Sequence, residues 1–491
     1  MSYVIDALNQ HGEKQPDHTA IIAGKDRISY GQLLNKLESF VQLIASTHCH
    51  TVGIDLDNSL PWVLADLAAM KLGLTAVPIP GFFSKTQVDH LLHTAQVDLL
   101  LRDTDETPGD EWQEVVSNYV GLRIYRRQTD RSAVGAKVTF TSGSTGHPKG
   151  VILSQQSIDD TTRGLVDSLG PLGLQRHLSV LPFATLLENI AGIYAPLVHG
   201  SELQITSLSE IGLTGASLDI DKFTTLLGST EADSMILVPQ LLTAIVTLTE
   251  FGLLDLSAYK MLAVGGGRVS RGLLDKANQL HLSVFEGYGL SECGSVLTLN
   301  LPNANLPGSV GKPLPHAQIR CSSEGELEVY GTVMEGYLND VAHGSSDWYA
   351  TGDLGHIDAN GFVHVTGRKK NVFITAFGRN VNPEWIEAGL SQQPAIAQAI
   401  AFGEGQDHNL ALLWLRYETS QADIETLIAS VNLELPDYAQ IHELIVVTEP
   451  LPATLLTANG RLKRDQAIER YRELIEEHYT PNPRRLSHVV L

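Results

Sequence analysis

A run of glycine and hydroxyl-bearing residues near position 145 has the chemistry of a phosphate-binding loop. It reads Thr-Phe-Thr-Ser-Gly-Ser-Thr-Gly-His-Pro-Lys-Gly over residues 139–150 and follows a predicted strand. Glycines let the backbone approach an anion closely, while hydroxyl and amide groups donate to phosphate oxygens and Lys149 supplies a positive charge. On composition alone, a Ser/Gly-rich surface turn is the alternative. A Walker A loop is excluded, because Pro148 directly precedes the lysine and Gly150 follows it.

A second segment, Gly-Tyr-Gly-Leu-Ser-Glu at 287–292, adds side chains that suit a nucleotide. The ring of Tyr288 can stack on a purine, and the carboxylate of Glu292 is a hard oxygen ligand for Mg²⁺ bound to phosphates. Taken alone, such a tyrosine is more often a core residue and such a glutamate a solvated charge. Their order along the chain, after the phosphate-like run, favours the functional interpretation.

The run from Thr141 to Gly150 resembles the phosphate loop of the acyl-CoA synthetases, adenylation domains and luciferases, and further segments match in that family's order over essentially the whole chain. The resemblance implies that ATP is bound with Tyr288 against adenine, Glu292 near Mg²⁺, and Asp353 and Arg368 on the ribose. It also implies an adenine-side turn at the glycine triplet 265–267. The ATP-binding residues so implied are Thr141, Ser142, Gly143, Ser144, Thr145, Gly146, Gly265, Gly266, Gly267, Gly287, Tyr288, Gly289, Ser291, Asp353 and Arg368.

The chain departs from this family at the catalytic lysine near its C-terminus, which the family places in an Asn-Gly-Lys turn. Here Asn459-Gly460 is followed by Arg461. A guanidinium can still stabilise negative charge at the α-phosphate, although its geometry differs from that of an ammonium group. Lys463 would share a face with Arg461 if the segment is extended. The expected catalytic set is therefore Lys149, Glu292 and one of Arg461 and Lys463.

The stretch Leu181–Asn189 is similar to the Leu-Pro-x-Ala-His-x-x-Glu stretch of fatty acyl-CoA synthetases. Thr185 stands where that family has a histidine at the entrance to its carboxylate pocket, so Phe183 and Thr185 are the predicted acid-pocket residues. Amino-acid-activating relatives place an aspartate here, and residues 183–186 contain no acidic side chain. An amino-acid substrate is therefore disfavoured.

The resemblance also implies a mobile C-terminal domain that serves two half-reactions, with its hinge at Lys370. Gly378 and Arg379 would then face the thiol donor, which is either CoA or the phosphopantetheine arm of an acyl carrier protein. Docking of an acidic carrier protein would need a local basic patch, because the net charge is -22. The arginines available for such a patch are Arg464, Arg470, Arg472, Arg484 and Arg485.

The elements that must position these residues have an α/β pattern. Apolar residues recur at helical spacing over 33–44, strand-like runs follow at 51–56, 76–79 and 97–101, and Ser84 and Gln87 form a predicted capping box. The rhythm returns at 234–239, 259–264 and 282–285, which predicts parallel sheets covered on both faces. A small β-rich subdomain is expected after residue 320 and a compact α+β unit after Arg368. The predicted domains are 1–368 and 369–491.

Bulk properties limit the possible functions. A chain of 491 residues with 43% hydrophobic and 18% charged residues should fold into at least two domains. The charge of -22 argues against nucleic-acid binding, and three cysteines without paired spacing argue against disulfides and a zinc site. Without a leader-like N-terminus or a long apolar run, a cytoplasmic protein without a transmembrane segment is expected.

The expected function is Mg-ATP-dependent activation of a carboxylic acid to an acyl-adenylate, followed by transfer to a thiol. A medium- or long-chain fatty acid is the first expectation, since residues 190–197 are largely apolar. An aryl-acid ligase is the nearest alternative. A non-catalytic nucleotide- or acyl-binding relative, suggested by Arg461, and a luciferase-type oxygenase are alternatives from other functional classes.

Overall fold

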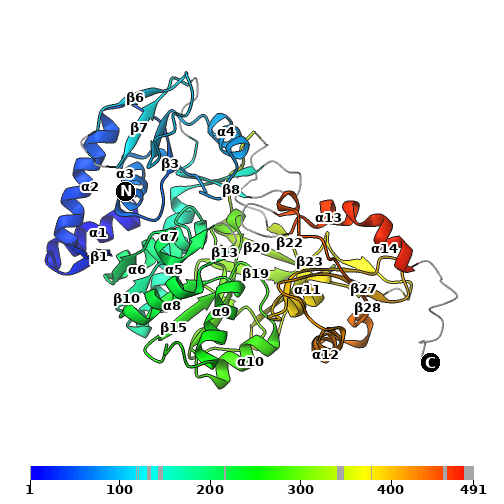
Figure 1. The fold of residues 1–491 in the computed structure, drawn as a ribbon. Coiled ribbons are helices and arrows are strands. Elements are labelled where there is room, and N and C mark those ends of the chain that lie inside the picture. The colour runs from blue at the N-terminus through cyan, green and yellow to red at the C-terminus, as the bar shows by residue number, and fades with distance from the viewer. Residues whose placement is uncertain are drawn as a thin grey trace. The chain divides into compact units, whose positions relative to one another are not determined.

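The structure is a computed structural model that describes residues 2–479 apart from 118, 120, 130–133, 142–147, 215–216, 340–347, 378 and 457–461. The chain divides into two compact units, Met1–Thr366 and Gly367–Leu491, which Figure 1 colours from blue to yellow and from yellow to red. Among the described residues, no helix combines the length and apolar character that crossing a membrane requires.

An eight-stranded sheet carries the phosphate-like run of the first unit. Its central strands are parallel, in the order β8-β4-β3-β5, and antiparallel strands extend both sides. The full order is β21 (Gly336–Tyr337), β9 (Lys149–Leu153), β8 (Lys137–Thr141), β4 (Thr75–Pro78), β3 (Thr51–Asp55), β5 (Leu99–Arg102), β7 (Arg123–Arg126) and β6 (Gln113–Val115). The sheet is thus mixed rather than purely parallel. β8 and β9 are joined closely enough in sequence to pair antiparallel, whereas β21 reaches β9 from a distant part of the chain.

A nine-stranded sheet carries the second nucleotide-like segment, and it too is parallel at its centre with antiparallel edges. Its order is β18 (Lys312–Pro313), β17 (Thr298–Leu299), β16 (Val284–Tyr288), β15 (Met261–Val264), β14 (Ser234–Leu237), β10 (Arg176–Leu178), β11 (Glu202–Ile205), β1 (Thr19–Ala23) and β2 (Asp26–Ser29). Between β11 and β14 in the sequence, β12 (Leu213–Thr214) and β13 (Ser217–Leu218) form a separate antiparallel pair.

Helices between these strands begin and end at the signals that the sequence provides. Ser84 and Gln87 form the predicted capping box, and Gly73 ends its helix with φ at 68°, which glycine adopts without strain. The first-unit helices are α1 (Tyr3–Lys14), α2 (Tyr30–Ala45), α3 (Leu60–Leu72), α4 (Lys85–Thr94), α5 (Gln155–Leu169), α6 (Ala195–His199), α7 (Leu208–Ile211), α8 (Ile220–Ser229), α9 (Pro239–Glu250) and α10 (Arg271–Gln279), with short 3₁₀ turns η1 (Gly170–Leu172) and η3 (Ser291–Cys293).

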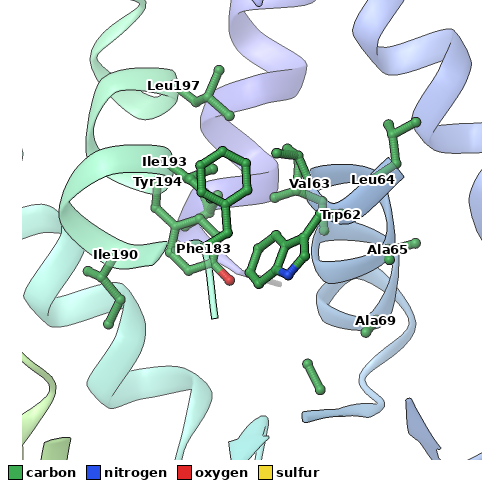
Figure 2. Close-up of a cluster of buried hydrophobic side chains, with 14 of the residues drawn as sticks. Trp62, Val63, Leu64, Ala65, Ala69, Phe183, Ile190, Ile193, Tyr194 and Leu197 are labelled. Atoms are coloured by element: carbon green, nitrogen blue, oxygen red, sulfur yellow. The ribbon is translucent and has the colours of Figure 1, made fainter. Parts of the chain in front are cut away.

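A π-helix, η2 (Glu188–Tyr194), continues directly into α6 and joins the main core of the first unit. Figure 2 shows Ile190, Ile193 and Tyr194 of η2 and Leu197 of α6 across from Trp62, Val63 and Ala65 of α3, with Phe183 among them. The rings of Trp62 and Phe183 meet edge to face, with their centroids 5.4 Å apart. Burial of these large side chains supplies much of the force that holds α3 and η2 together.

The β-rich subdomain predicted after residue 320 is a four-stranded sheet of β19 (Ala317–Cys321), β20 (Glu326–Gly331), β22 (Tyr349–Ile357) and β23 (Val363–Arg368). The second unit is α+β, as expected, with a three-stranded sheet over its own core. Its elements are β24 (Phe373–Ile374), β25 (Asn380–Val381), α11 (Pro383–Ser391), β26 (Ile396–Phe402), β27 (Asn409–Leu415), α12 (Gln421–Asn432), η4 (Asp437–Ala439), β28 (Ile441–Val446), η5 (Ala453–Leu455), α13 (Arg464–Arg470) and α14 (Arg472–Tyr479). The α/β architecture is confirmed.

Candidate functional site

The phosphate-like run joins two neighbouring antiparallel strands. Thr141 ends β8 and Lys149 begins β9, and these two residues are direct cross-strand partners. The predicted phosphate ligands Ser142, Gly143, Ser144, Thr145 and Gly146 lie outside the described residues. The described ends nevertheless place Thr141 and the charged Lys149 at the same edge of the eight-stranded sheet.

The two glycine segments of the nucleotide interpretation lie at the ends of neighbouring parallel strands. Gly265–Gly267 follow β15, and Gly287 and Tyr288 end β16, which pairs with β15 in parallel register. In open α/β sheets, ligands bind where the carboxyl ends of parallel strands meet. A Cβ on Gly265 would lie 3.6 Å from the Gly287 carbonyl oxygen, an ordinary contact distance, so protein packing alone does not demand glycine there. Gly266, by contrast, has a φ of 73°, which lies in the left-handed region that favours glycine, so its backbone conformation itself calls for glycine.

Packing against the backbone requires glycine at position 289. A Cβ at this position would lie 1.7 Å from the Ser295 carbonyl oxygen. Ser295 closes the turn that begins at η3, where its amide donates to the Leu290 carbonyl over 3.0 Å. Ser291 and Glu292 belong to η3, so the close approach at Gly289 fixes how this turn leaves β16.

Tyr288 and Asp353 come together although 65 residues separate them. The Tyr288 hydroxyl donates to Asp353 Oδ2 over 2.6 Å, and Asp353 is 3% exposed. The backbone amide of Asp353 donates to the Thr351 hydroxyl, which in turn donates to the Leu327 carbonyl. The aspartate of the expected ribose site is therefore fixed on β22 beside the tyrosine of the expected adenine site.

Lys149 and Glu292 are linked by Tyr337, the last residue of β21. The Tyr337 hydroxyl donates to Glu292 Oε1 over 2.9 Å, and the Lys149 ammonium lies 5.3 Å from the centroid of the Tyr337 ring. Burial, reinforced by the Glu292 charge, raises the pKa of Tyr337 to about 12, so the phenol stays protonated as a donor. One tyrosine thus orients the predicted metal-binding carboxylate beside the predicted phosphate-binding cation.

Both predicted nucleotide carboxylates lie near one buried thiol. Burial raises the pKa of Cys293 well above its ordinary value, and the charges of Glu292 and Asp353 raise it further.

No group of three or more His, Cys, Asp or Glu residues that could hold a metal occurs in the described part of the chain. Magnesium carried by nucleotide phosphates needs only one or two protein carboxylates, so Glu292 fits it.

The two predicted acid-pocket residues have different surroundings. Phe183 is 1% exposed and packs in the main core against Trp62 (Figure 2). The Thr185 hydroxyl donates to the Pro182 carbonyl over 2.6 Å. Asn58 fixes this segment to the chain before α3: its side chain donates to the Leu181 carbonyl and accepts from the Phe183 amide. The acid-pocket role remains a prediction.

The remaining predicted residues belong to the second unit. Arg368 ends β23, Lys370 lies in the exposed turn that follows, and Arg379 is exposed beside β25, while Gly378 and Arg461 lie outside the described residues. The Lys463 ammonium donates to the Thr454 carbonyl over 3.0 Å. Three arginines of the suggested carrier-docking patch are paired with carboxylates: Arg464 with Glu387, Arg470 with Glu449 and Arg472 with Glu469.

Sequence reasoning missed Tyr337 and Tyr349. Burial raises the pKa of both phenols, and the charge of Glu292 contributes to each shift. Tyr349 is part of the Trp-Tyr-Ala-Thr-Gly-Asp run that points to Asp353, so its place next to a predicted site residue was a usable signal. Tyr337 had none, because its contact with Glu292 spans 45 residues and depends on the pairing of β21 with β9.

Comparison with protein families gives two matches that together span most of the chain. Residues 8–338 match the model of the AMP-binding enzymes, and residues 370–482 match the model of the AMP-binding enzyme C-terminal domain. The chain is 26% identical over 485 residues to the long-chain-fatty-acid–CoA ligase FadD15 of Mycobacterium bovis, covering 84% of this chain and 80% of the relative. It is 28% identical to the 2-succinylbenzoate–CoA ligase of Bacillus licheniformis, covering 80% and 85%.

Solved structures show the same fold at lower identity. The anthranilate CoA ligase AuaEII, in complex with anthranoyl-AMP, has a TM-score of 0.78 and 18% identity, covering 96% of this chain and 97% of that one. O-succinylbenzoate coenzyme A synthetase from Bacillus subtilis, in complex with ATP and a magnesium ion, has a TM-score of 0.73 and 22% identity, covering 94% and 98%. Another structure of that enzyme, a double mutant, is bound to the product analogue OSB-NCoA.

Proposed function

The chain belongs to the AMP-binding enzyme family and is an AMP-forming acid–CoA ligase, and we propose that its acid is a medium- or long-chain fatty acid. In the first half-reaction the carboxylate attacks the α-phosphate of ATP and pyrophosphate leaves with the electron pair of the broken bond. In the second, the CoA thiol attacks the acyl carbonyl and AMP leaves.

The residues of the first unit divide the work on ATP. Tyr288 stacks on adenine, Asp353 accepts hydrogen bonds from the ribose hydroxyls, and Lys149 neutralises phosphate charge. Arg368, which the second unit contributes, would donate to the ribose oxygens. Glu292 would hold Mg²⁺, which would supply positive charge to offset that of the phosphates as pyrophosphate leaves. The observation that carries this assignment is the contact chain from Lys149 through Tyr337 to Glu292, which brings a cation and a carboxylate together at the end of the phosphate-like run.

A second cation, Arg461 or Lys463, would offset charge at the α-phosphate. A permanently charged guanidinium at 461 preserves the charge of the family's lysine but not its geometry. The Lys463 ammonium donates to the Thr454 carbonyl over 3.0 Å, so this cation already has a partner in its own unit. We therefore favour Arg461 as the cation that meets the phosphate.

A fatty acid is favoured by the stretch before η2. Leu181–Glu188 resembles the corresponding stretch of fatty acyl-CoA synthetases, and residues 190–197, which follow it, are largely apolar. One of the relatives acts on long-chain fatty acids. An aryl acid is the second candidate, because the other named relatives and the similar structures act on succinylbenzoate or anthranilate.

CoA is favoured over an acyl carrier protein as the thiol. Carrier proteins are usually acidic, so their docking calls for unpaired basic side chains on a chain whose net charge is -22. Arg464, Arg470 and Arg472 each face a carboxylate of this same chain. The exposed Arg379, next to β25, is the proposed contact for a CoA phosphate.

The test is acid-dependent release of pyrophosphate from Mg-ATP with fatty acids of graded length, succinylbenzoate, anthranilate and amino acids, each with CoA or a phosphopantetheinylated carrier protein. Release with medium or long fatty acids, followed by CoA-dependent turnover, is expected. Release with an aryl acid alone would replace the fatty-acid proposal. Binding of ATP without release for any acid would identify a non-catalytic relative.

A further inference from the structure

Four polar side chains that the proposed function does not use form a closed network inside the apolar core of the first unit. Lys137, Asp66 and Asn189 are each 1% exposed, and Tyr194 is fully buried. They come from three elements, namely β8, α3 and η2. Burial lowers the pKa of Lys137, while the charge of Asp66 opposes that shift.

Every hydrogen-bonding group at the centre of this network has a partner. The Lys137 ammonium donates to Asp66 Oδ1 over 2.8 Å, to the Tyr194 hydroxyl over 2.8 Å and to the Asn189 side-chain oxygen. Asp66 Oδ2 accepts from Asn189 Nδ2 over 3.0 Å and from the Tyr194 hydroxyl. Three ammonium donors and both carboxylate oxygens are used, so the mutual orientation of the four groups is fixed.

Stability alone does not account for such a network. An ion pair buried in an apolar core contributes little net free energy, because desolvation of both charges offsets their attraction, and apolar residues of similar volume often replace it without loss. A fully satisfied buried network does, however, specify one arrangement of the elements that contribute to it.

The three elements lead to the two halves of the proposed active site. Lys137 begins β8, which ends at Thr141 where the phosphate-like run starts. Asn189 lies one turn after Thr185, and its amide donates to the Thr185 carbonyl over 3.0 Å. The chain before α3 holds the same stretch through the two hydrogen bonds of Asn58 with Leu181 and Phe183. The segment 181–187, the predicted acid segment, is thus tied to the strand of the phosphate-like run.

We propose that Lys137, Asp66, Asn189 and Tyr194 are positioning residues that hold the phosphate-like run and the acid segment in register, so that the acid carboxylate meets the α-phosphate. This inference rests on the proposed function. Because a misplacement of about 1 Å can reduce a rate about a hundredfold, loosening this network lowers the rate of adenylation while leaving the binding contacts of ATP in place.

The fold-preserving variant is Tyr194→Phe, which keeps the ring in the core (Figure 2) and removes the hydroxyl shared by Lys137 and Asp66. Its matched control is Tyr30→Phe. Tyr30 is equally buried in the same core, and its hydroxyl donates to the carbonyls of Leu197 and Ser201. A double variant, Lys137→Met with Asp66→Leu, replaces the ion pair by apolar side chains of similar size.

The experiment compares melting temperature, Mg-ATP affinity, and the kcat and KM of acid-dependent pyrophosphate release. Tyr194→Phe and the double variant should lose kcat by about tenfold or more, with wild-type Mg-ATP affinity, while Tyr30→Phe keeps wild-type kcat at a similar melting temperature. The inference would be overturned if Tyr194→Phe and Tyr30→Phe had equal kcat, or if the double variant had the kcat of the wild type.

Hydrogen exchange separates this inference from the proposed function. If the network couples the two segments, Mg-ATP slows amide exchange across residues 181–187 in the wild type and in Tyr30→Phe but not in Tyr194→Phe. This readout needs no acid and no turnover. A wild type that releases no pyrophosphate with any acid refutes the proposed function, whereas identical exchange in all three proteins refutes the positioning network.

Discussion

Glu292, Glu286 and Glu188 have the same side chain, but each carboxylate meets different partners. Glu292 accepts from the Tyr337 hydroxyl beside Lys149. Glu286, two residues before Tyr288, is 8% exposed and accepts from the Gly308 amide. Glu188 is fully buried, and neither of its carboxylate oxygens has a hydrogen-bond partner among the described residues. Environment, rather than residue type, decides what each glutamate can do.

Glu286 gives a prediction for stability against pH. Burial raises its pKa to about 7, although Gly308, Arg268 and Arg271 oppose the shift. Between its unfolded pKa and about 7 the folded state binds more protons than the unfolded state, so the free energy of unfolding falls as pH rises, by up to about 3 kcal/mol from this group. Glu286→Gln should therefore raise the melting temperature at pH 8 and change it little at pH 4.5. Equal shifts at both pH values would contradict this.

Tyr337 gives a prediction for adenylation. Tyr337→Phe keeps the ring next to Lys149 but removes the donor to Glu292, so the carboxylate loses its fixed orientation. We expect kcat of pyrophosphate release to fall about tenfold, matching the ~1.5 kcal/mol of a hydrogen bond to a charged group, and the magnesium requirement to rise. Tyr330→Phe, at a half-exposed position on β20, is the control and should behave as the wild type. An unchanged magnesium requirement in Tyr337→Phe would argue against Glu292 as the metal ligand.

Among the elements, the ends of neighbouring strands bring predicted site residues together. β15 and β16 bring Gly265 and Tyr288 to one edge, and β8 and β9 bring Thr141 and Lys149 together. The same edge shows that glycines can serve different purposes: Gly289 avoids a backbone clash, whereas Gly265 has room for a methyl group.

Alanine at each of these glycines should separate packing from ligand binding. Gly289→Ala should destabilise the protein by about 2 kcal/mol or more, because its Cβ would overlap the Ser295 carbonyl. Gly265→Ala should keep the wild-type melting temperature but weaken Mg-ATP binding, since a side chain there would face the nucleotide. Thermal unfolding and calorimetric titration measure the two effects. Wild-type ATP affinity in Gly265→Ala would remove the triplet from the proposed adenine site.

The π-helix η2 leads to a prediction about a buried charge. His177 Nε2 lies 3.6 Å from Glu188 Oε1, and a Cβ on Gly192 would lie 2.6 Å from that oxygen, so glycine leaves room for the pair. His177→Ala should cost about 3 kcal/mol, because it removes the polar neighbour 3.6 Å from the buried Glu188 carboxyl group. Glu188→Gln in the His177→Ala background should recover most of that loss. Denaturant unfolding gives the free energy of unfolding of each variant. If the loss in the double variant equals the sum of the losses in the two single variants, the residues do not interact.

At the scale of the whole molecule, two separately packed units share the proposed reaction. The first holds Lys149, Glu292, Tyr288 and Asp353, and the second holds Arg368, Lys463 and the exposed Arg379. Each unit has its own apolar core, as in Val381 and Ile386 of the second. That independence is what a domain rotation between two half-reactions would need.

Lys370, in the exposed turn after β23, tests the proposed rotation. Lys370→Pro fixes φ near about -65° and should restrict movement of the second unit. We expect pyrophosphate release to continue while CoA-dependent thioester formation falls about tenfold or more, because only the second half-reaction would need the second unit to rotate. Lys370→Ala removes the same side chain without restricting the backbone and should keep thioester formation. Parallel losses of both half-reactions in Lys370→Pro would indicate general damage instead of a hinge.

Local sequence patterns predict the α/β class, many of the elements and the chemistry expected of the nucleotide segments. Ser84 and Gln87 cap a helix, Gly73 ends one, and the strand predicted at 51–56 is β3. Local patterns are less accurate at the boundary between a helix and the next strand. The strand predicted from Val97 begins at Leu99, because the Val97 amide donates to the Leu92 carbonyl at the end of α4 and is not free to pair in the sheet.

Contacts between distant side chains could be seen only after the chain had folded. Tyr337 reaches Glu292 across 45 residues, and Lys137 reaches Asp66 across 71. The π-helical hydrogen bonding of Glu188–Tyr194 was equally hidden, since an apolar repeat does not distinguish it from an α-helix. Such contacts depend on strand pairing and burial between distant segments, which no local spacing encodes. The motifs therefore predict the chemistry, and the fold shows which residues contact the predicted site residues.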